Sequence, residues 1–482
     1  MFIDMSRVKE LGAEFGIELS DDEVASYIER AEEMESTLGH LRPEPPDSED
    51  DRDVVVADDE YDAFRYRFRI AGGDGPLSNL TAAVKDNISV AGVPMTCGSD
   101  TLAFTPSCHA TVVRRLLSAG ANLIGTTNMD EWALHTTGET CAHGRTVNPR
   151  ADGCVPGGSS SGSGAAVAAG LVDIAIGSDS GGSIRIPASF CGVVGFKPTH
   201  RSVSRFGYAD LAPSLDHLGP IADSVEVAAR ALEAISGRDL RDPSTKVSNP
   251  PSDIASATEE SPVGLQVAVI EEAFELSDDP VADAVSDATW ALADEGVGVD
   301  RISIDGYEDT PFVLSRISGA EFATYVEKNG LTYGTGTGYS EEWRATVEAA
   351  NESGGYGENV TNRLVPNSAL LKATGGQSYT TAQIIRQQFT GRVADALDRY
   401  DALICPTTAL IPPEFGTVDE REDIRRTVAN TAPFNLTGTP ALSVPCGEVD
   451  DKPVGMQIVA DWNDEVTAVT LGSAVERLRR NR

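Results

Sequence analysis

The sequence predicts an α/β protein whose central sheet is mixed, mostly parallel and covered by helices, with a small helical appendage at the N-terminus. Two patterns support this fold class. From about Tyr61 onward, short apolar runs typical of buried strands alternate with segments of helical periodicity, and such alternation produces a largely parallel sheet covered by helices. Residues 1–60 lack that alternation and are strongly acidic. A chain of 482 residues is also long enough for a large core and more than one domain.

The first domain, residues 1–60, is expected to be a helical appendage followed by an acidic linker. Ser20 and Glu23 have the spacing of a capping box, in which each side chain binds the backbone N–H of the other at the start of a helix. A proline cluster and an acidic run at 43–53 then end the helical pattern. The second domain is expected to occupy residues 61–482.

The second domain begins with a strand, residues 80–84, that leads directly to Lys85. The later elements predicted from apolar runs and helical periodicity are a helix at 110–119, a strand at 122–125, a small-residue helix at 165–170, strands at 171–177 and 267–270, a helix at 279–295, and strands at 401–406 and 441–445. Residues 238–263 are rich in Pro, Ser, Asp and Glu and are predicted to be an exposed excursion.

The composition is strongly acidic. The chain has 75 Asp and Glu residues against 38 Lys and Arg, a net charge of -37. Nucleic acids and anionic membranes are bound through a surplus of basic residues, so neither is a predicted direct partner. No segment has the roughly 18 apolar residues of a membrane span, and residues 1–20 lack the apolar core of a signal peptide. We therefore expect a cytoplasmic protein.

Lysine is scarce, at 7 of the 38 basic residues. Together with the net charge, this bias favours a halophilic protein from a very salty cytoplasm. At 1 M salt the Debye length is roughly 3 Å, so the repulsion between surface carboxylates becomes tolerable. An ordinary acidic enzyme is the alternative.

Cysteine and histidine give no sign of a metal site. The seven cysteines are dispersed without a C-x-x-C pair, and the six histidines lack the spacing of metal-binding motifs. We expect reduced, mostly buried thiols, no structural metal and no cofactor.

Two stretches rich in serine and glycine, residues 157–164 and 178–187, mark the predicted functional site. Glycine lets backbone N–H groups approach a ligand closely, and serine supplies a hydroxyl that can act as nucleophile or proton donor. The helix and strand between the stretches would bring both to one edge of the sheet, where open α/β sheets bind ligands. With Lys85, they have the parts of a serine hydrolase that uses no histidine.

Residues 158–162 also satisfy the G-x-S-x-G pattern of the α/β-hydrolase nucleophile elbow. That motif directly follows a strand, whereas residues 150–156 have the composition of a loop. The phosphate-binding patterns G-x-x-x-x-G-K and G-x-G-x-x-G are absent. Both alternatives are therefore disfavoured.

The lysine and the two stretches resemble the amidase signature family. The similar segments are residues 84–87, 156–160, 177–185, 190–199, 215–220, 443–447 and 453–457. The resemblance extends over residues 80–478 and implies the amidase signature fold for the second domain, with a substrate-pocket insertion at roughly 300–390.

By this resemblance, Ser183 is the nucleophile, which attacks an amide carbonyl to form an acyl-enzyme that water then hydrolyses. Ser159 is the bridging serine, held in the family by a cis peptide bond, and it passes the proton between Ser183 and Lys85. Lys85 is the base and, later, the acid for the leaving amine. The resemblance thus implies a Ser-Ser-Lys triad.

The resemblance assigns the oxyanion hole to the backbone N–H groups of Ser180, Gly181, Gly182 and Ser183. Glycines suit this role because several donors must point at one oxygen with no side chain in the way. Asp179 and Arg185 are expected to brace this loop, and Ser160 to support the site.

A lysine serves as a base near neutral pH only if its pKa falls from about 10.4 to near 7, and burial away from carboxylates is the expected cause. Asp86 is adjacent, but in an extended strand its side chain points to the opposite face. Lys197 matches a family position without a catalytic role. His217, which has an acid beside it, is expected to be structural.

Two functions follow from the resemblance. The first is a stand-alone amidase that hydrolyses a small carboxamide to a carboxylate and ammonia. The alternative is the glutaminase A subunit of a tRNA-dependent amidotransferase, which residues 128–131 and 203–207 resemble. Residues 10–40, 91–95 and 429–434 resemble stand-alone amidases whose helical N-terminal extension packs in a homodimer. We therefore expect a homodimeric amidase, with the identity of its small amide substrate open.

Overall fold

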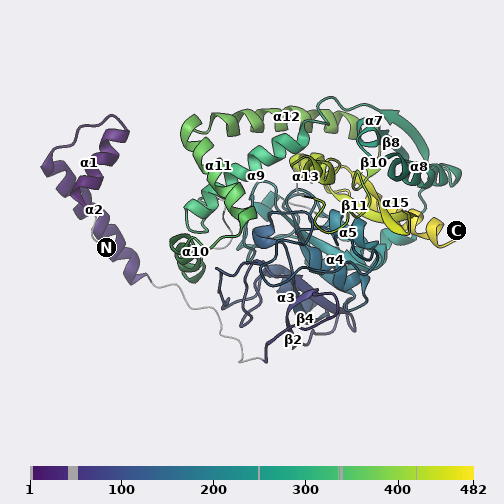
Figure 1. Ribbon diagram of the computed structural model, residues 1–482, viewed down its shortest axis with the longest axis horizontal. Helices are drawn as coiled ribbons and strands as arrows, with labels where there is room; N and C mark the ends of the chain where they lie inside the picture. Colours follow the sequence, from purple (N-terminus) through teal and green to yellow (C-terminus); the bar gives the residue numbers. More distant parts are fainter. Residues whose placement is uncertain are drawn as a thin grey trace. The chain divides into compact units, whose positions relative to one another are not determined.

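The chain forms two compact units, Met1–Ser48 and Glu49–Arg482. The computed structural model describes residues 4–41, 53–247, 250–334, 336, 340–418 and 421–481 (Figure 1). The predicted domain boundary at residue 60 and the pocket insertion at 300–390 stay predictions.

The first unit contains two helices, α1 (Met5–Glu14) and α2 (Asp21–His40). The predicted capping box is present at the start of α2, because the Ser20 hydroxyl accepts the N–H of Glu23 and the Glu23 carboxylate accepts the N–H of Ser20. Several large apolar side chains of this unit are more than half exposed, namely Phe15, Ile17, Met34 and Leu38.

The second unit is built on one sheet, to which the described residues contribute 12 strands. In chain order they are β1 (Val55–Val56), β2 (Phe64–Ile70), β3 (Thr81–Lys85), β4 (Asn122–Thr127), β5 (Ile174–Asp179), β6 (Val194–Lys197), β7 (His217–Ala222), β8 (Gln266–Ile270), β9 (Gly298–Ile302), β10 (Ala402–Pro406), β11 (Ala441–Val449) and β12 (Lys452–Ala460). Their order across the sheet is β1-β2-β4-β3-β5-β7-β6-β11-β12-β10-β8-β9.

The sheet is mixed, as predicted, but it is less parallel than expected. β3 is parallel to β4 and β5, and β8 is parallel to β9 and β10. The other neighbouring pairs formed by the described residues are antiparallel. One cause is local: Asp450 and Asp451 both have positive φ and join β11 to β12, a turn geometry that reverses the chain into a hairpin.

The helices of this unit pack on the sheet and on one another (Figure 1). They are α3 (Thr111–Ser118), α4 (Ser161–Ala168), α5 (Arg185–Cys191), α6 (Val225–Ile235), α7 (Glu271–Glu275), α8 (Asp279–Asp294), α9 (Thr310–Glu327), α10 (Glu341–Ser353), α11 (Glu358–Thr374), α12 (Gln377–Leu397), α13 (Arg421–Val428), α14 (Ala432–Thr437) and α15 (Glu465–Arg480), with short 3-10 turns η1 (Glu131–Ala133), η2 (Pro243–Val247) and η3 (Ser256–Glu259).

Alternate residues of one strand lie in different apolar cores. Ala82 and Val84 of β3 pack in the core that α3, α6, α8 and α15 cover, whereas Ala83 packs with α4. This follows from the two-residue period of a strand, which sends successive side chains to opposite faces. A further core, which includes Trp132, Phe322 and Trp343, lies among α9, α10 and their neighbours.

The segment 238–263 is packed rather than wholly exposed, which corrects the prediction. Asp242, Ile254 and Ala257 are buried. The Asp242 carboxylate accepts the N–H groups of Arg205 and Ser244. The polar composition arises because side chains satisfy the backbone of tight turns, in addition to facing water.

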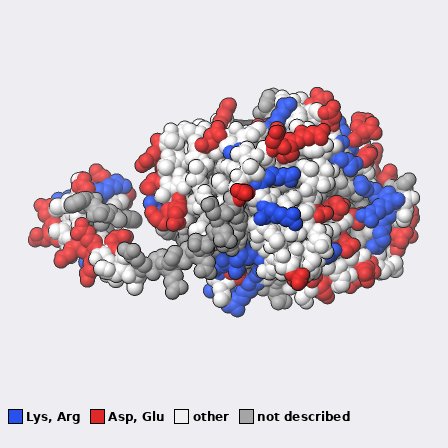
Figure 2. Space-filling model, turned by 90° about the horizontal axis from the view of Figure 1, so that it is seen from below, with Lys and Arg blue, Asp and Glu red and all other residues white. Residues whose placement is uncertain are grey.

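The surface is acidic. On the face shown in Figure 2, acidic side chains are spread widely and basic ones gather in fewer places. Within the described ranges, no helix combines the length and the apolar character that crossing a membrane requires.

Candidate active site

Lys85 is the last residue of β3 and its side chain is fully buried. Its Nζ donates to Ser159 Oγ at 2.8 Å and to Ser178 Oγ at 2.9 Å. Burial lowers the pKa of Lys85 to about 7, because the charged amine loses its hydration, although the charges of Asp130 and Asp179 oppose this. A large fraction of Lys85 is therefore neutral at pH 7 and able to accept a proton.

The side chain of Asp86 points away from Lys85, as the strand alternation predicts. One of its carboxylate oxygens accepts both the N–H and the hydroxyl of Thr96. The adjacent acid therefore makes no ion pair with Lys85 within the described part of the chain, and the ammonium form gains no close partner from it.

Ser159 is fully buried near the start of the first serine stretch. The peptide bond between Gly158 and Ser159 is cis, the conformation that the resemblance implies for this serine. A Cβ atom at position 158 would lie 1.9 Å from Asp130 Oδ2, so only glycine fits there. Ser160 Oγ donates to the carbonyl of Ser178 at 3.2 Å and accepts its N–H at 3.3 Å. Ser160 thereby ties this stretch to the end of β5.

The nucleophile-elbow alternative finds no support in the local structure. Within residues 150–156, the sole β contact is an isolated bridge between Cys154 and Glu414. The strand that the elbow requires is therefore missing ahead of residues 158–162.

Ser183 lies in the loop between β5 and α5, and it is 9% exposed. Among the described residues, no hydrogen bond joins its hydroxyl to Ser159 or Lys85. The structure thus brings Lys85 and Ser159 together, while the contact from Ser159 to Ser183 stays a prediction. Such contacts are often long without substrate and tighten when it binds.

The loop that carries the predicted oxyanion donors is held by Asp179. One carboxylate oxygen accepts the N–H of Gly182 at 2.8 Å and the other accepts that of Ile184 at 3.2 Å. The Gly182 N–H is thus occupied, which differs from the predicted set of four donors. The N–H groups of Gly181 and Ser183 have no acceptor among the described residues.

Asp179 and Arg185 form the predicted pair, and both are fully buried. Arg185 Nη2 lies 3.0 Å from Asp179 Oδ1, and Nε donates to Oδ2 at 3.0 Å. Burial alone would raise the pKa of Asp179, but the charge and hydrogen bonds of Arg185 lower it to about 2. The carboxylate therefore stays ionised and holds the loop at neutral pH.

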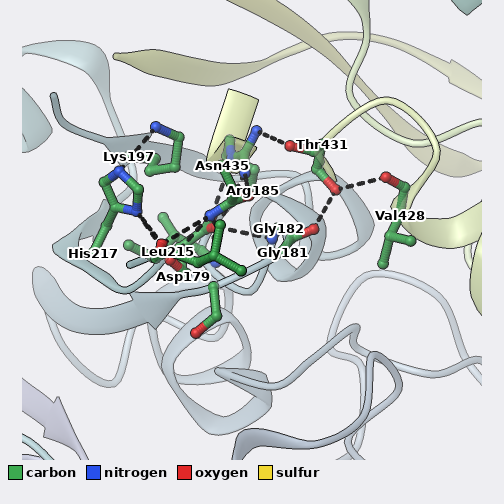
Figure 3. A network of polar contacts seen from close by, with 12 residues as sticks. Asp179, Gly181, Gly182, Arg185, Lys197, Leu215, His217, Val428, Thr431 and Asn435 are labelled. Carbon is green, nitrogen blue, oxygen red and sulfur yellow. Dashed lines mark hydrogen bonds and ion pairs between the residues drawn. The ribbon is translucent and has the colours of Figure 1, made fainter. Parts of the chain in front are cut away.

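The remaining donors of Arg185 reach residues that sequence reasoning missed. They are the carbonyl of Thr431 at 3.1 Å and Asn435 Oδ1 at 2.6 Å (Figure 3), together with Gln457 Oε1 at 2.6 Å. Ser178, which contacts Lys85, was also missed. A sequence signal existed for Gln457, because it interrupts the apolar run of β12, where a polar side chain needs a buried partner.

Lys197 and His217 form a buried contact beside Asp179. Lys197 Nζ lies 3.4 Å from His217 Nε2 and donates to the carbonyls of Pro198 and Thr439. His217 Nδ1 faces the carbonyls of Leu215 at 2.6 Å and Asp179 at 3.2 Å, and among the described residues no carboxylate is its partner (Figure 3). Burial lowers the pKa of both side chains. The arrangement is that of a structural histidine.

Residues able to hold a metal do not gather in this region. Within the described ranges, no group of three or more His, Cys, Asp or Glu side chains could bind a metal ion. The free thiols of the seven cysteines form no disulfide bond, and most are buried.

Sequence comparison identifies the family. Residues 52–469 match the family described as Amidase. The chain belongs to the amidase signature family. The chain is similar to the A subunit of the glutamyl-tRNA(Gln) amidotransferase from Natronomonas pharaonis, with 42% identity over 409 residues that cover 83% of this chain and 96% of the relative.

Two solved structures are similar in fold to this chain. The A subunit of the glutamyl-tRNA(Gln) amidotransferase from Thermotoga maritima matches with a TM-score of 0.72 and 33% identity, over 84% of this chain and 85% of that one. The peptide amidase of Stenotrophomonas maltophilia matches with a TM-score of 0.68 and 28% identity, over 84% of each chain.

Proposed function

We propose that the chain hydrolyses a carboxamide through an acyl-Ser183 and that, as the A subunit of a tRNA-dependent amidotransferase, it releases ammonia from glutamine. The buried contact between Lys85 Nζ and Ser159 Oγ carries the chemistry. The similarity to amidotransferase A subunits supports glutamine as the substrate and further subunits as partners. This order reverses the one predicted from the sequence, which placed the stand-alone amidase first.

The proposed reaction begins with neutral Lys85. Lys85 takes a proton from Ser159, and Ser159 takes one from Ser183 as the Ser183 oxygen bonds to the amide carbon. The carbon–nitrogen bond then breaks, the proton returns through Ser159 to the nitrogen, and ammonia leaves. Water, deprotonated by the same route, adds to the acyl-Ser183 and releases the carboxylate.

Backbone donors would stabilise the negative charge that develops on the carbonyl oxygen. The N–H groups of Gly181 and Ser183 support this assignment, since they have no acceptor among the described residues. Preorganised donors of this kind each contribute roughly 10²- to 10³-fold in rate.

Ammonia release tests the proposal. The purified chain is offered glutamine, propionamide and benzamide in molar KCl, alone and with the remaining amidotransferase subunits and glutamylated tRNA, and Ser183→Ala is the inactive control. We expect hydrolysis of glutamine that increases when the other subunits are present. Turnover of simple amides without partners, with no response to glutamine, would contradict the amidotransferase assignment.

A stand-alone amidase is the second candidate, because one observation favours it. Beside the loop, a δ carbon of Leu314 lies 3.1 Å from the Cβ position of Gly181, an apolar surface that suits an apolar acyl group. A cytoplasmic location stays a prediction.

The homodimer belongs to this second candidate, and exposed apolar side chains of the first unit support it. If the unit mediates a dimer, light scattering should give wild type twice the mass of one chain. The Phe15 side chain is 78% exposed, and the Phe15→Glu variant should be monomeric. Trp290→Glu, at a side chain 51% exposed in α8, is the matched control and should stay dimeric. A monomeric wild type would show the homodimer prediction to be wrong.

A further inference from the structure

The peptide unit between Gly181 and Gly182 is held from both sides. Thr431 Oγ1 donates to the carbonyl oxygen of Gly181 at 2.7 Å, and the N–H of Gly182 donates to Asp179 Oδ1 at 2.8 Å (Figure 3). The C=O and N–H of a trans peptide point in opposite directions within one plane. The two contacts therefore fix the orientation of that plane.

Arg185 joins the two groups that hold this peptide. Its guanidinium pairs with Asp179 and donates from Nη1 to the carbonyl of Thr431 at 3.1 Å. The side chains of Arg185, Asp179 and Thr431 are all fully buried. The contacts form a closed ring that runs from Arg185 through Asp179, the Gly181–Gly182 peptide and Thr431 back to Arg185.

The loop depends on this ring because it contains two glycines. Glycine restricts its own backbone less than any other residue, so an unheld Gly-Gly peptide can rotate. Rotation would turn the Gly181 carbonyl, the negative end of the peptide dipole, toward the face that the N–H groups of Gly181 and Ser183 now offer. Thr431 also packs closely on Gly182, since a Cβ atom there would lie 2.3 Å from Thr431 Oγ1.

We propose that Thr431 is a positioning residue that keeps the oxyanion donors of Gly181 and Ser183 correctly oriented. The inference rests on the proposed function, in which these donors stabilise the charge on the carbonyl oxygen. Thr431 itself contacts the loop and touches no reacting atom in the proposed mechanism.

Two substitutions separate the hydroxyl of Thr431 from its bulk. Thr431→Val keeps the shape and removes the hydroxyl, so kcat should fall by roughly 10- to 100-fold, less than the roughly 10²- to 10³-fold effect of losing an oxyanion donor outright, with KM changed less than about threefold. Thr431→Ser restores the hydroxyl and should keep at least about a third of the wild-type kcat. Full activity in Thr431→Val, or equal losses in both variants, would overturn the inference.

Reaction of Ser183 with a fluorophosphonate separates this inference from the proposed function. The Ser183 oxygen bonds to phosphorus as fluoride leaves, its proton passes through Ser159 to Lys85, and the polarised phosphoryl oxygen lies at the same donors, whatever the natural substrate. The labelling rate should follow the order wild type, Thr431→Ser, Thr431→Val. If wild type is labelled but hydrolyses no amide, only the proposed function is contradicted. If Thr431→Val is labelled as fast as wild type, only the inference about Thr431 is contradicted. A wild type that is not labelled would contradict both. Thr431→Ala replaces Thr431→Val if the latter does not fold.

Discussion

At the scale of single residues, the buried amine of Lys85 decides how the proposed reaction depends on pH. Its pKa is about 7, and only the neutral amine accepts a proton. As pH falls below 7, the amine becomes protonated, so kcat/KM should fall about tenfold per pH unit, and above 7 it should level off. We expect this profile from initial rates of ammonia release between pH 5 and 9.

Lys197 supplies a matched control, since it too is fully buried but contacts neither serine stretch in the described structure. Lys85→Ala should lower kcat by roughly 100-fold or more. The Lys197→Met variant should show the same pH dependence of kcat/KM as wild type, with the fall below pH 7, even if it unfolds at a lower temperature. If the residual activity of Lys85→Ala still falls as the pH drops below 7, the pKa near 7 belongs to another group.

Ser159 is predicted to carry the proton between Lys85 and Ser183, and another buried serine of the same stretch tests this role. Ser159→Ala should lower kcat by roughly 10²- to 10⁴-fold, because the relay is lost. Ser163 binds Thr127 Oγ1 at 2.7 Å and does not contact Lys85. Ser163→Ala should therefore keep its kcat and lose about 1 kcal/mol of unfolding free energy in urea titrations. Equal rates in the two variants would exclude the relay.

The site residues that share a short segment of the sequence were predictable. The residues that are distant from them in the sequence were not. Lys85, Ser159 and the pair Asp179 and Arg185 lie in motifs that glycine and serine make conspicuous, and the structure places Lys85 on Ser159 and Arg185 on Asp179. Thr431 is 246 residues from Arg185, and nothing local in the sequence shows that its hydroxyl reaches the loop. Only the folded sheet brings such segments together.

At the scale of elements, the Asp179–Arg185 pair connects the end of β5 to the start of α5 and fixes the loop between them. Asp179→Asn leaves a buried guanidinium without its counter-charge, so the free energy of unfolding at pH 7 should fall by roughly 3–5 kcal/mol. The folded-state pKa of Asp179 is about 2, below its ordinary value of 3.8. Stability from the ionised carboxylate is therefore present above pH 4 and lost as pH falls toward 2.

The difference in the free energy of unfolding between wild type and Asp179→Asn should therefore be largest above pH 4 and should decrease below pH 4. Denaturant unfolding at several pH values measures this difference. A gap that is the same at pH 7 and pH 2.5 would mean that the loss comes from packing instead of charge. Asp173→Asn is the control, because Asp173 binds Thr81 at the opposite end of β5 and has no cationic partner in the described structure.

Element positions followed from the sequence better than element directions did. The predicted strands at 80–84, 122–125 and 267–270 differ from β3, β4 and β8 by a residue or two at their ends. Periodicity shows that a segment is extended but says nothing about which strand it pairs with. The antiparallel contact of β6 with β11 pairs residues that are far apart in the chain, such as Lys197 and Ala441, and no local pattern encodes it.

At the scale of the whole molecule, the net charge of -37 governs how stability responds to salt. Carboxylates on a compact surface repel one another, and unfolding spreads them apart. Raising KCl from 0.1 M to 1 M shortens the Debye length from about 10 Å to about 3 Å and should raise the thermal unfolding midpoint, with most of the gain below 1 M. Differential scanning calorimetry measures this shift directly.

Screening must be distinguished from the general effect of a concentrated solute. Glycine betaine is zwitterionic and carries no net charge, so at equal concentration it leaves the Debye length unchanged. If carboxylate repulsion limits stability, KCl should raise the midpoint well beyond betaine, whereas equal shifts would point to solute exclusion from the surface. A thermal unfolding midpoint that is the same at 0.1 M and 1 M KCl would contradict the halophilic prediction and leave an ordinary acidic enzyme. In that case, repulsion between carboxylates would not limit the stability of the fold.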